Sequence, residues 1–184
     1  MNLANKITIL RILMIPLFLF FLLKPFPYHM IFAAITFLLA AVTDSLDGYI
    51  ARKRNQITNF GKFVDPLADK LLVVSALVCL VEMGKVPALA AIIIISREFV
   101  ITGFRLLAVT EGKVIAASWW GKLKTVTQII AVMALILDNF PFRYIGIPFD
   151  RIALYLSVGI TIWSGVDYIY KNRSIFRSGK DGLK

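Results

Sequence analysis

The sequence predicts an all-α integral membrane protein, a bundle of six transmembrane helices with a polar cavity open to the cytoplasmic side. Three observations support this prediction. Hydrophobic residues make up 59% of the 184 residues and the mean hydropathy is +0.78, which is too apolar for a soluble domain. Six apolar runs alternate with short turn-rich segments. Several runs are shorter than the roughly 20 residues that cross a bilayer, so each helix must complete its span with polar sequence.

The predicted helices are separated by segments in which Asn, Gly and Pro recur. In chain order we expect the helices at residues 5–24, 28–54, 61–82, 86–109, 120–138 and 150–171. We interpret the first run as a membrane helix rather than a signal peptide, because it ends in a turn with Pro25 and Pro27 and no small-residue cleavage site follows. Since the chain contains no repeat and no shift in composition, we expect a single membrane domain over residues 1–184.

The basic residues predict the orientation of the bundle. With the N-terminus inside, the outer loops hold only four of the 21 lysines and arginines and the other 17 lie inside. The four are Lys24, Lys85, Arg143 and Arg151. This asymmetry follows the positive-inside rule. It predicts a multi-pass protein of the cytoplasmic membrane whose polar cavity faces the cytoplasm.

Composition also excludes several functions. The net charge of +10 does not predict nucleic-acid binding, because the basic residues are dispersed between apolar runs and form no compact basic domain. Cys79 is the only cysteine, so an intrachain disulfide is excluded, and its apolar surroundings indicate a small buried residue. His29, the only histidine, lies in a predicted outer turn, where we interpret it as a loop residue rather than a ligand.

The polar half of each predicted helix alternates between its start and its end. The residues concerned are Asn5, Thr8 and Arg11, then Asp44, Asp47 and Arg52, then Asp65 and Asp69, then Arg97, Glu98 and Arg105, then Lys122, Lys124 and Gln128, and finally Asp167. Because successive helices run in opposite directions, all these halves lie at one side of the membrane. Charges within a membrane are costly unless they face water or one another, so we expect them to enclose one cavity. The alternative is side chains that only snorkel to the interface.

Four aspartates mark the centre of this cavity. Asp44 and Asp47 are three residues apart and Asp65 and Asp69 are four apart, so each pair lies on a single face of its helix. The two helices are joined by a short basic turn, which allows the four carboxylates to converge. Four adjacent anions would repel and take up protons unless cations compensated them. Divalent metal ions are the natural compensation.

An all-oxygen carboxylate site suits Mg²⁺, Mn²⁺ or Ca²⁺, and a metal pair of this kind clamps an in-line phosphoryl displacement. Phosphate chemistry is therefore the leading hypothesis. The alternative is that the aspartates are ordinary helix caps. Beside them, Gly48 leaves room for a ligand near the backbone, Ala51 permits close helix approach, and Arg52 has a guanidinium that matches a phosphate.

The complete pattern resembles the signature of the CDP-alcohol phosphatidyltransferase family. It reads Asp-x₂-Asp-Gly-x₂-Ala-Arg-x₈-Gly-x₃-Asp-x₃-Asp from Asp44 to Asp69, without a departure from the family's spacing. The resemblance implies a six-helix membrane fold, usually a homodimer, in the cytoplasmic membrane of a bacterium. It also implies transfer of a phosphatidyl group from CDP-diacylglycerol to an alcohol, with release of CMP.

The resemblance also implies residue roles. Asp44, Asp47, Asp65 and Asp69 would hold two divalent metal ions, with Mg²⁺ or Mn²⁺ preferred. Asp69 would in addition be the general base. Gly48, Ala51 and Arg52 would face the nucleotide of CDP-diacylglycerol. Asn5 and Thr8 form a polar stripe with Arg11, for which interfacial capping and contact with this headgroup remain open.

Basic residues flank the aspartates and bear on the acceptor. Arg97 follows an apolar run and so sits deep, Arg105 is two turns further on, and Lys122 and Lys124 open the next helix. An acceptor that carries its own phosphate, such as glycerol 3-phosphate, needs such donors, whereas serine or choline does not. The stretches 96–105 and 121–128 also resemble those of family members that use glycerol 3-phosphate. Glu98 has no assigned role beyond pairing with a base.

Three alternatives remain open at this point. One is a member of the same family with another acceptor, such as inositol phosphate or serine. A second is an intramembrane prenyltransferase, although the chain is short for such a bundle and its aspartate spacing differs. The third is a cation transporter, which should carry ionisable groups near the midplane with access from both sides. The preferred mechanism is attack by a hydroxyl of glycerol 3-phosphate, deprotonated by Asp69, on the lipid-linked phosphorus.

Overall fold

A computed structural model of the chain describes residues 3–53, 59–110 and 118–173, and the side chains of residues 9–43, 70–109 and 118–173. These residues form six α-helices and one short 3₁₀ helix, and the described ranges contain no strand. The elements are α1 (Leu3–Leu23), α2 (His29–Lys53), α3 (Asn59–Glu82), α4 (Ala88–Thr110), α5 (Trp119–Ile136), η1 (Phe142–Ile145) and α6 (Phe149–Lys171). Every α-helix begins and ends within two residues of its predicted position, so the all-α class is confirmed.

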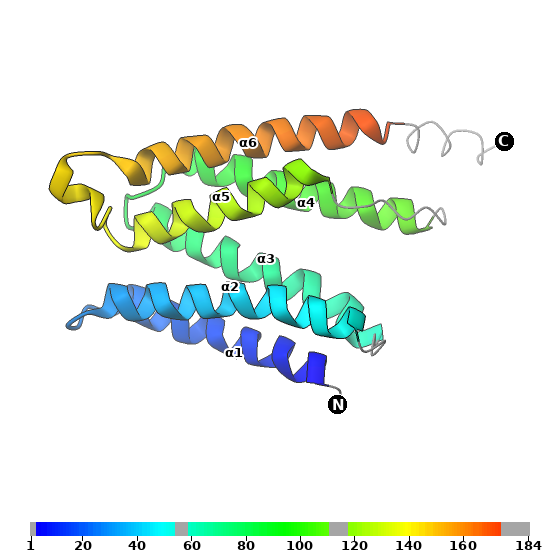
Figure 1. Ribbon diagram of the computed structural model, residues 1–184, viewed down its shortest axis with the longest axis horizontal. Helices are drawn as coiled ribbons and strands as arrows, with labels where there is room; N and C mark the ends of the chain where they lie inside the picture. Colours follow the sequence, from blue (N-terminus) through cyan, green and yellow to red (C-terminus); the bar gives the residue numbers. More distant parts are fainter. Residues whose placement is uncertain (1–2, 54–58, 111–117, 174–184) are drawn as a thin grey trace.

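The helices lie roughly along one direction and alternate in sense, with the first turn of α1 and the last turn of α6 at the same end (Figure 1). The turns α1–α2, α3–α4 and α5–α6 lie at the opposite end (Figure 1). This arrangement places the last turns of α2, α4 and α6 and the first turns of α1, α3 and α5 together. The predicted convergence of the polar helix halves at one end of the bundle is therefore confirmed at the level of the helices.

The larger of two hydrophobic clusters lies mainly in the other half of the bundle. Along the bundle, α1 packs against α2 and α3, while α6 packs against α4 and α5. Phe18 and Phe37 are fully buried with ring centroids 5.5 Å apart. Small residues such as Ala33, Ala40 and Ala76 are also fully buried, which lets the helix backbones approach closely. Cys79 belongs to this core, as predicted.

The outside of the bundle is rich in large apolar side chains. Leu13, Ile92, Leu106 and Trp163 are each exposed over more than half of their surface, which a water-soluble monomer rarely tolerates over contiguous areas. Within the described residues, α6 is the one helix that is long and apolar enough to cross a membrane by length and composition. Shorter apolar stretches occupy parts of α1 and α2. Six membrane spans therefore remain a prediction.

The turn between α5 and α6 differs from the prediction. The fifth helix ends at Ile136 rather than at residue 138, because Asp138 and Asn139 have φ values of 51° and 61°, a conformation that terminates a helix. The Asn139 side chain donates to the Ile147 carbonyl at 2.7 Å and accepts from the Asp150 amide at 3.1 Å. This asparagine ties the turn to the start of α6.

Candidate functional site

The signature aspartates lie on two neighbouring helix ends. Asp44 and Asp47 are in the second half of α2, and Asp65 and Asp69 are in the first half of α3, which contacts α2 (Figure 1). Their side chains lie outside the described residues, as do those of the predicted headgroup ligands Asn5, Thr8, Gly48, Ala51 and Arg52. The helical backbone and the spacing place each pair on one helix face. This all-oxygen donor set fits Mg²⁺ or Mn²⁺. The described side chains contain no other cluster of three potential metal ligands.

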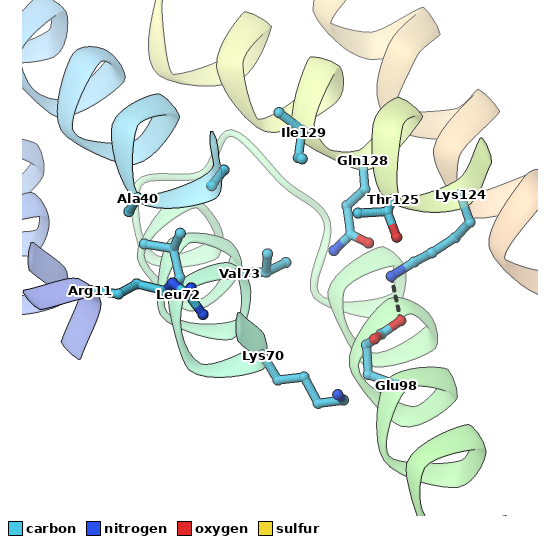
Figure 2. Close-up of a pocket in the computed structure, with 11 residues that line it drawn as sticks. Arg11, Ala40, Lys70, Leu72, Val73, Glu98, Lys124, Thr125, Gln128 and Ile129 are labelled. Carbon is cyan, nitrogen blue, oxygen red and sulfur yellow. Dashed lines mark hydrogen bonds and ion pairs between the residues drawn. The ribbon is translucent and has the colours of Figure 1, made fainter. Parts of the chain in front are cut away.

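Two adjoining pockets begin where the aspartate segment ends. Lys70, which follows Asp69, lines both pockets together with Glu98 and Thr125. The first, which we call the inner pocket, also receives Arg11 from α1 and Gln128 from α5 (Figure 2). The remaining lining residues of the inner pocket are Ala40, Ala41, Leu72, Val73, Lys124 and Ile129. The inner pocket is therefore a junction of five helices.

The second pocket, which we call the basic pocket, lies between α3, α4 and α5. Its charged lining consists of Lys70, Arg97, Arg105, Lys122 and Glu98. The other lining residues are Ile101, Thr102, Gly121 and Thr125. Four cations against one carboxylate among these residues make the pocket suited to an anion. Guanidinium groups in particular match the oxygens of a phosphate.

The start of α5 is fixed by a helix cap. Ser118 has an extended backbone, and its hydroxyl accepts a hydrogen bond from the Gly121 amide at 3.1 Å. Such N-caps favour helix formation by satisfying amides that have no partner within the helix. Gly121 and Lys122 of the basic pocket directly follow this cap, so Ser118 sets their position.

Glu98 forms a buried ion-pair network at the wall between the two pockets. Its Oε1 atom accepts from the Lys124 ammonium (Figure 2) and from Nη1 of Arg97 at 3.2 Å. Lys124 is only 4% exposed, and a buried charge of this kind requires a partner. Glu98 therefore pairs with two neighbouring bases, Arg97 and Lys124.

Arg97 and Arg105 are also held from α6. Nη2 of Arg97 donates to the Ser164 hydroxyl at 2.6 Å. Nε of Arg105 donates to the Tyr168 hydroxyl at 3.2 Å, and the guanidinium lies 5.5 Å from the centre of the Tyr168 ring. Each contact holds the guanidinium of an arginine that also lines the basic pocket.

The structure thus brings together three of the four predicted acceptor-binding residues. Arg97, Arg105 and Lys122 share the basic pocket, and Arg97 sits near the middle of α4, as its apolar surroundings predicted. Lys124 lines the inner pocket instead and is directed at Glu98. Its residue spacing explains the difference, because Lys122 and Lys124 point about 200° apart around a helix.

Sequence reasoning missed several residues of the site. Lys70 was overlooked beside the aspartates, although a lysine followed by the apolar run of α3 is itself a signal of a deep charge. Arg11 was considered as part of a polar stripe for which interfacial capping and headgroup contact were both open, and its full burial was not predicted. Ser164 and Tyr168 carry no sequence signal of function, because only tertiary packing brings α6 against the arginines of α4.

The fold and the site define a class of protein: a helical bundle, apolar outside, that carries four aspartates on two neighbouring helices next to a pocket lined mostly by cations. The family model of the CDP-alcohol phosphatidyltransferases matches residues 1–163. The chain belongs to this family, and the resemblance of its aspartate signature is confirmed.

Three bacterial proteins are similar to the chain over most of its length. The chain is 49% identical to the CDP-diacylglycerol–glycerol-3-phosphate 3-phosphatidyltransferase of Bacillus subtilis, over 93% of this chain and 95% of the relative. It is 40% identical to the protein of the same name from Haemophilus influenzae, over 91% of each chain. It is 38% identical to a probable phosphatidylglycerophosphate synthase of Mycobacterium tuberculosis, over 91% of this chain and 80% of the relative.

Proposed function

We infer that this chain is an enzyme of phospholipid biosynthesis that transfers the phosphatidyl group of CDP-diacylglycerol to glycerol 3-phosphate. The products are phosphatidylglycerophosphate and CMP. The observation that carries this inference is the basic pocket, in which Lys70, Arg97, Arg105 and Lys122 adjoin the aspartate segment. The names of the three relatives agree with it.

We propose that the aspartates hold two divalent metal ions, Mg²⁺ or Mn²⁺. Asp44 and Asp47 of α2 would face Asp65 and Asp69 of α3. When bound, the ions supply positive charge that stabilises the phosphorus oxygens and the departing CMP. The support is the chemistry of the donor set, four carboxylates on two adjoining helix ends.

Acceptor binding, proton transfer and binding of the lipid headgroup are assigned to residues of the chain. The basic pocket holds the phosphate of the acceptor and so presents its hydroxyl towards the aspartate segment. Asp69 takes the hydroxyl proton as the oxygen forms its bond to the lipid-linked phosphorus, while the phosphorus–oxygen bond to CMP breaks. Gly48, Ala51 and Arg52, with Asn5 and Thr8, are assigned to the headgroup of CDP-diacylglycerol.

We propose that the bundle crosses the bacterial cytoplasmic membrane six times, with the site facing the cytoplasm. The apolar exterior of the helices and the distribution of basic residues support this placement. The acyl chains of the substrate can then stay in lipid while its headgroup reaches the aspartates. Following the family resemblance, we also propose a homodimer.

Inositol phosphate is an alternative acceptor that is also consistent with the basic pocket. Inositol phosphate also brings a phosphate, so the basic pocket suits it, whereas free serine brings no phosphate for the basic side chains of the pocket to bind. A cation transporter is less well supported, because the described residues at the opposite half of the bundle pack into an apolar core and contribute no polar pathway there.

The test is direct identification of the lipid product. Purified enzyme in mixed micelles receives CDP-diacylglycerol, Mg²⁺ and one of glycerol 3-phosphate, inositol phosphate, serine or glycerol, and CMP release is followed with mass spectrometry of the lipid. We expect product with glycerol 3-phosphate alone. Turnover of serine or inositol phosphate, without turnover of glycerol 3-phosphate, would overturn the assignment.

A further inference from the structure

Two hydroxyl groups of α6 contact the two arginines of the basic pocket. Ser164 is fully buried and Tyr168 is 2% exposed, and they are one helical turn apart on the same face of α6. Ser164 accepts from Arg97 at 2.6 Å and Tyr168 accepts from Arg105 at 3.2 Å. Both residues lie beyond residue 163, where the match to the family model ends, so the family pattern assigns them no role.

The neighbouring residue on α6 strengthens this arrangement. Gly165 lies directly behind Arg97, and a Cβ atom added to it would be only 3.3 Å from Cγ of the arginine. Contacts of that length require the neighbour to shift. The Arg97 side chain is therefore confined on one side by Gly165 and Ser164 and on the other by its ion pair with Glu98, 3.2 Å away.

Such confinement matters for anion binding. An arginine side chain has many rotamers, and ordering it on binding reduces affinity, whereas a guanidinium that is already directed at its ligand avoids that loss. We propose that Ser164 and Tyr168 are positioning residues, which fix Arg97 and Arg105 in the geometry that binds a phosphorylated acceptor. This proposal rests on the proposed function of the basic pocket.

A purely structural role for these hydroxyls makes a different prediction. Hydroxyls that only join α6 to α4 would affect the stability of the bundle, and with it the turnover number and both substrates alike. Positioning residues act through the arginines. Their loss therefore raises the KM for glycerol 3-phosphate selectively, and only while the arginine is present.

The experiment uses the full chain with the variants Ser164→Ala and Tyr168→Phe, each of which removes one hydroxyl. We expect the KM for glycerol 3-phosphate to rise about two- to tenfold, the range of one typical hydrogen bond. The KM for CDP-diacylglycerol and kcat should stay within about twofold of the wild-type values, because the lost interaction serves the acceptor alone. The matched control is Ser157→Ala, since Ser157 is equally buried on α6 and has no hydrogen-bond partner among the described residues.

A double-mutant cycle completes the test. In an Arg105→Ala background, Tyr168→Phe should leave the KM for glycerol 3-phosphate unchanged, because the group that it positions is gone. Equal effects in both backgrounds, or an unchanged KM in both single variants, would overturn the proposal. If Arg97→Ala and Arg105→Ala raise this KM while the hydroxyl variants do not, only the positioning role fails. If the arginine variants also leave it unchanged, the proposed function of the pocket fails.

Discussion

At the scale of single residues, we expect acceptor binding to depend most directly on Arg97. Its guanidinium contacts Glu98 and Ser164 and lines the basic pocket. A charge-assisted contact to a phosphate contributes roughly 1.5 to 3 kcal/mol, so we expect Arg97→Ala to raise the KM for glycerol 3-phosphate about ten- to hundredfold. The KM for CDP-diacylglycerol should change far less. Steady-state kinetics with each substrate varied in turn check this, and an unchanged acceptor KM would remove Arg97 from the pocket.

The aspartates should separate into two groups by their response to metal. Asp44→Asn and Asp47→Asn weaken metal binding, so raising the Mg²⁺ concentration should restore part of the activity. Asp69→Asn should not respond in this way, because asparagine cannot accept the acceptor's proton, and loss of a general base typically costs a factor of about 10² to 10⁴. CMP release and binding of CDP-diacylglycerol are measured across a Mg²⁺ titration. Recovery of Asp69→Asn to near-normal turnover at high Mg²⁺ would assign Asp69 to metal binding alone.

Some residues of the site could be predicted from the sequence and others could not. That Arg97 and Arg105 line a pocket was predictable, because charges inside an apolar run are costly unless they face water or one another, and Lys122 was expected beside them at the start of the next helix. Ser164 and Tyr168 were not, since serine and tyrosine are unremarkable in an apolar helix until a neighbouring helix supplies an arginine. Lys124 was placed correctly on α5, but its partner Glu98 could be found only from the rotation of α5 against α4.

At the scale of helices, Glu98 joins α4 to α5 through Lys124, which is 4% exposed. Breaking a buried pair by removing one partner leaves an uncompensated charge, which typically costs roughly 3 to 5 kcal/mol. We therefore expect Glu98→Gln to lower the thermal unfolding midpoint in detergent clearly. The matched control is Asp167→Asn, whose partner Lys171 is mostly exposed, and for which about 0 to 1 kcal/mol is expected. Equal midpoints for both variants would contradict a stabilising network at Glu98.

The turn between α5 and α6 offers a second test at this scale. Asn139 makes two side-chain hydrogen bonds and has a φ of 61°. Asn139→Gly loses the hydrogen bonds alone, whereas Asn139→Ala also carries the strain of a left-handed conformation, about 1 to 2 kcal/mol more. We expect stability to fall in the order Asn139, Gly, Ala, with kcat unchanged. Unfolding in detergent measures the order, and a more stable alanine variant would contradict the assigned turn geometry.

The helices themselves were predictable to within two residues at each end. Apolar runs bounded by Pro, Gly and Asn leave little choice of element. The end of α5 is the exception: Leu137 continues the apolar run, but the left-handed backbone at Asp138 and Asn139 ends the helix at Ile136. The 3₁₀ helix η1 was not predicted, because its four residues have no periodic pattern to read.

At the scale of the whole molecule, the topology can be tested with single cysteines. The native Cys79 is buried in α3, so Cys79→Ala provides a background without thiols. Tyr144 in η1 is 77% exposed and Arg173 follows α6 at the other end of the bundle. In intact spheroplasts, a membrane-impermeant maleimide should label Tyr144→Cys and leave Arg173→Cys unlabelled. Inverted vesicles should give the reverse result, and labelling of both from one side would contradict the six-span topology.

The residues of the inner and basic pockets lie in the middle of their helices or nearer one end of the bundle. That end holds the first turn of α1 and the last turn of α6 (Figure 1). With that end in the cytoplasm, glycerol 3-phosphate arrives and CMP departs through the same leaflet. A complete reaction cycle then displaces no charge across the bilayer. Turnover in sealed proteoliposomes should accordingly be insensitive to an imposed membrane potential.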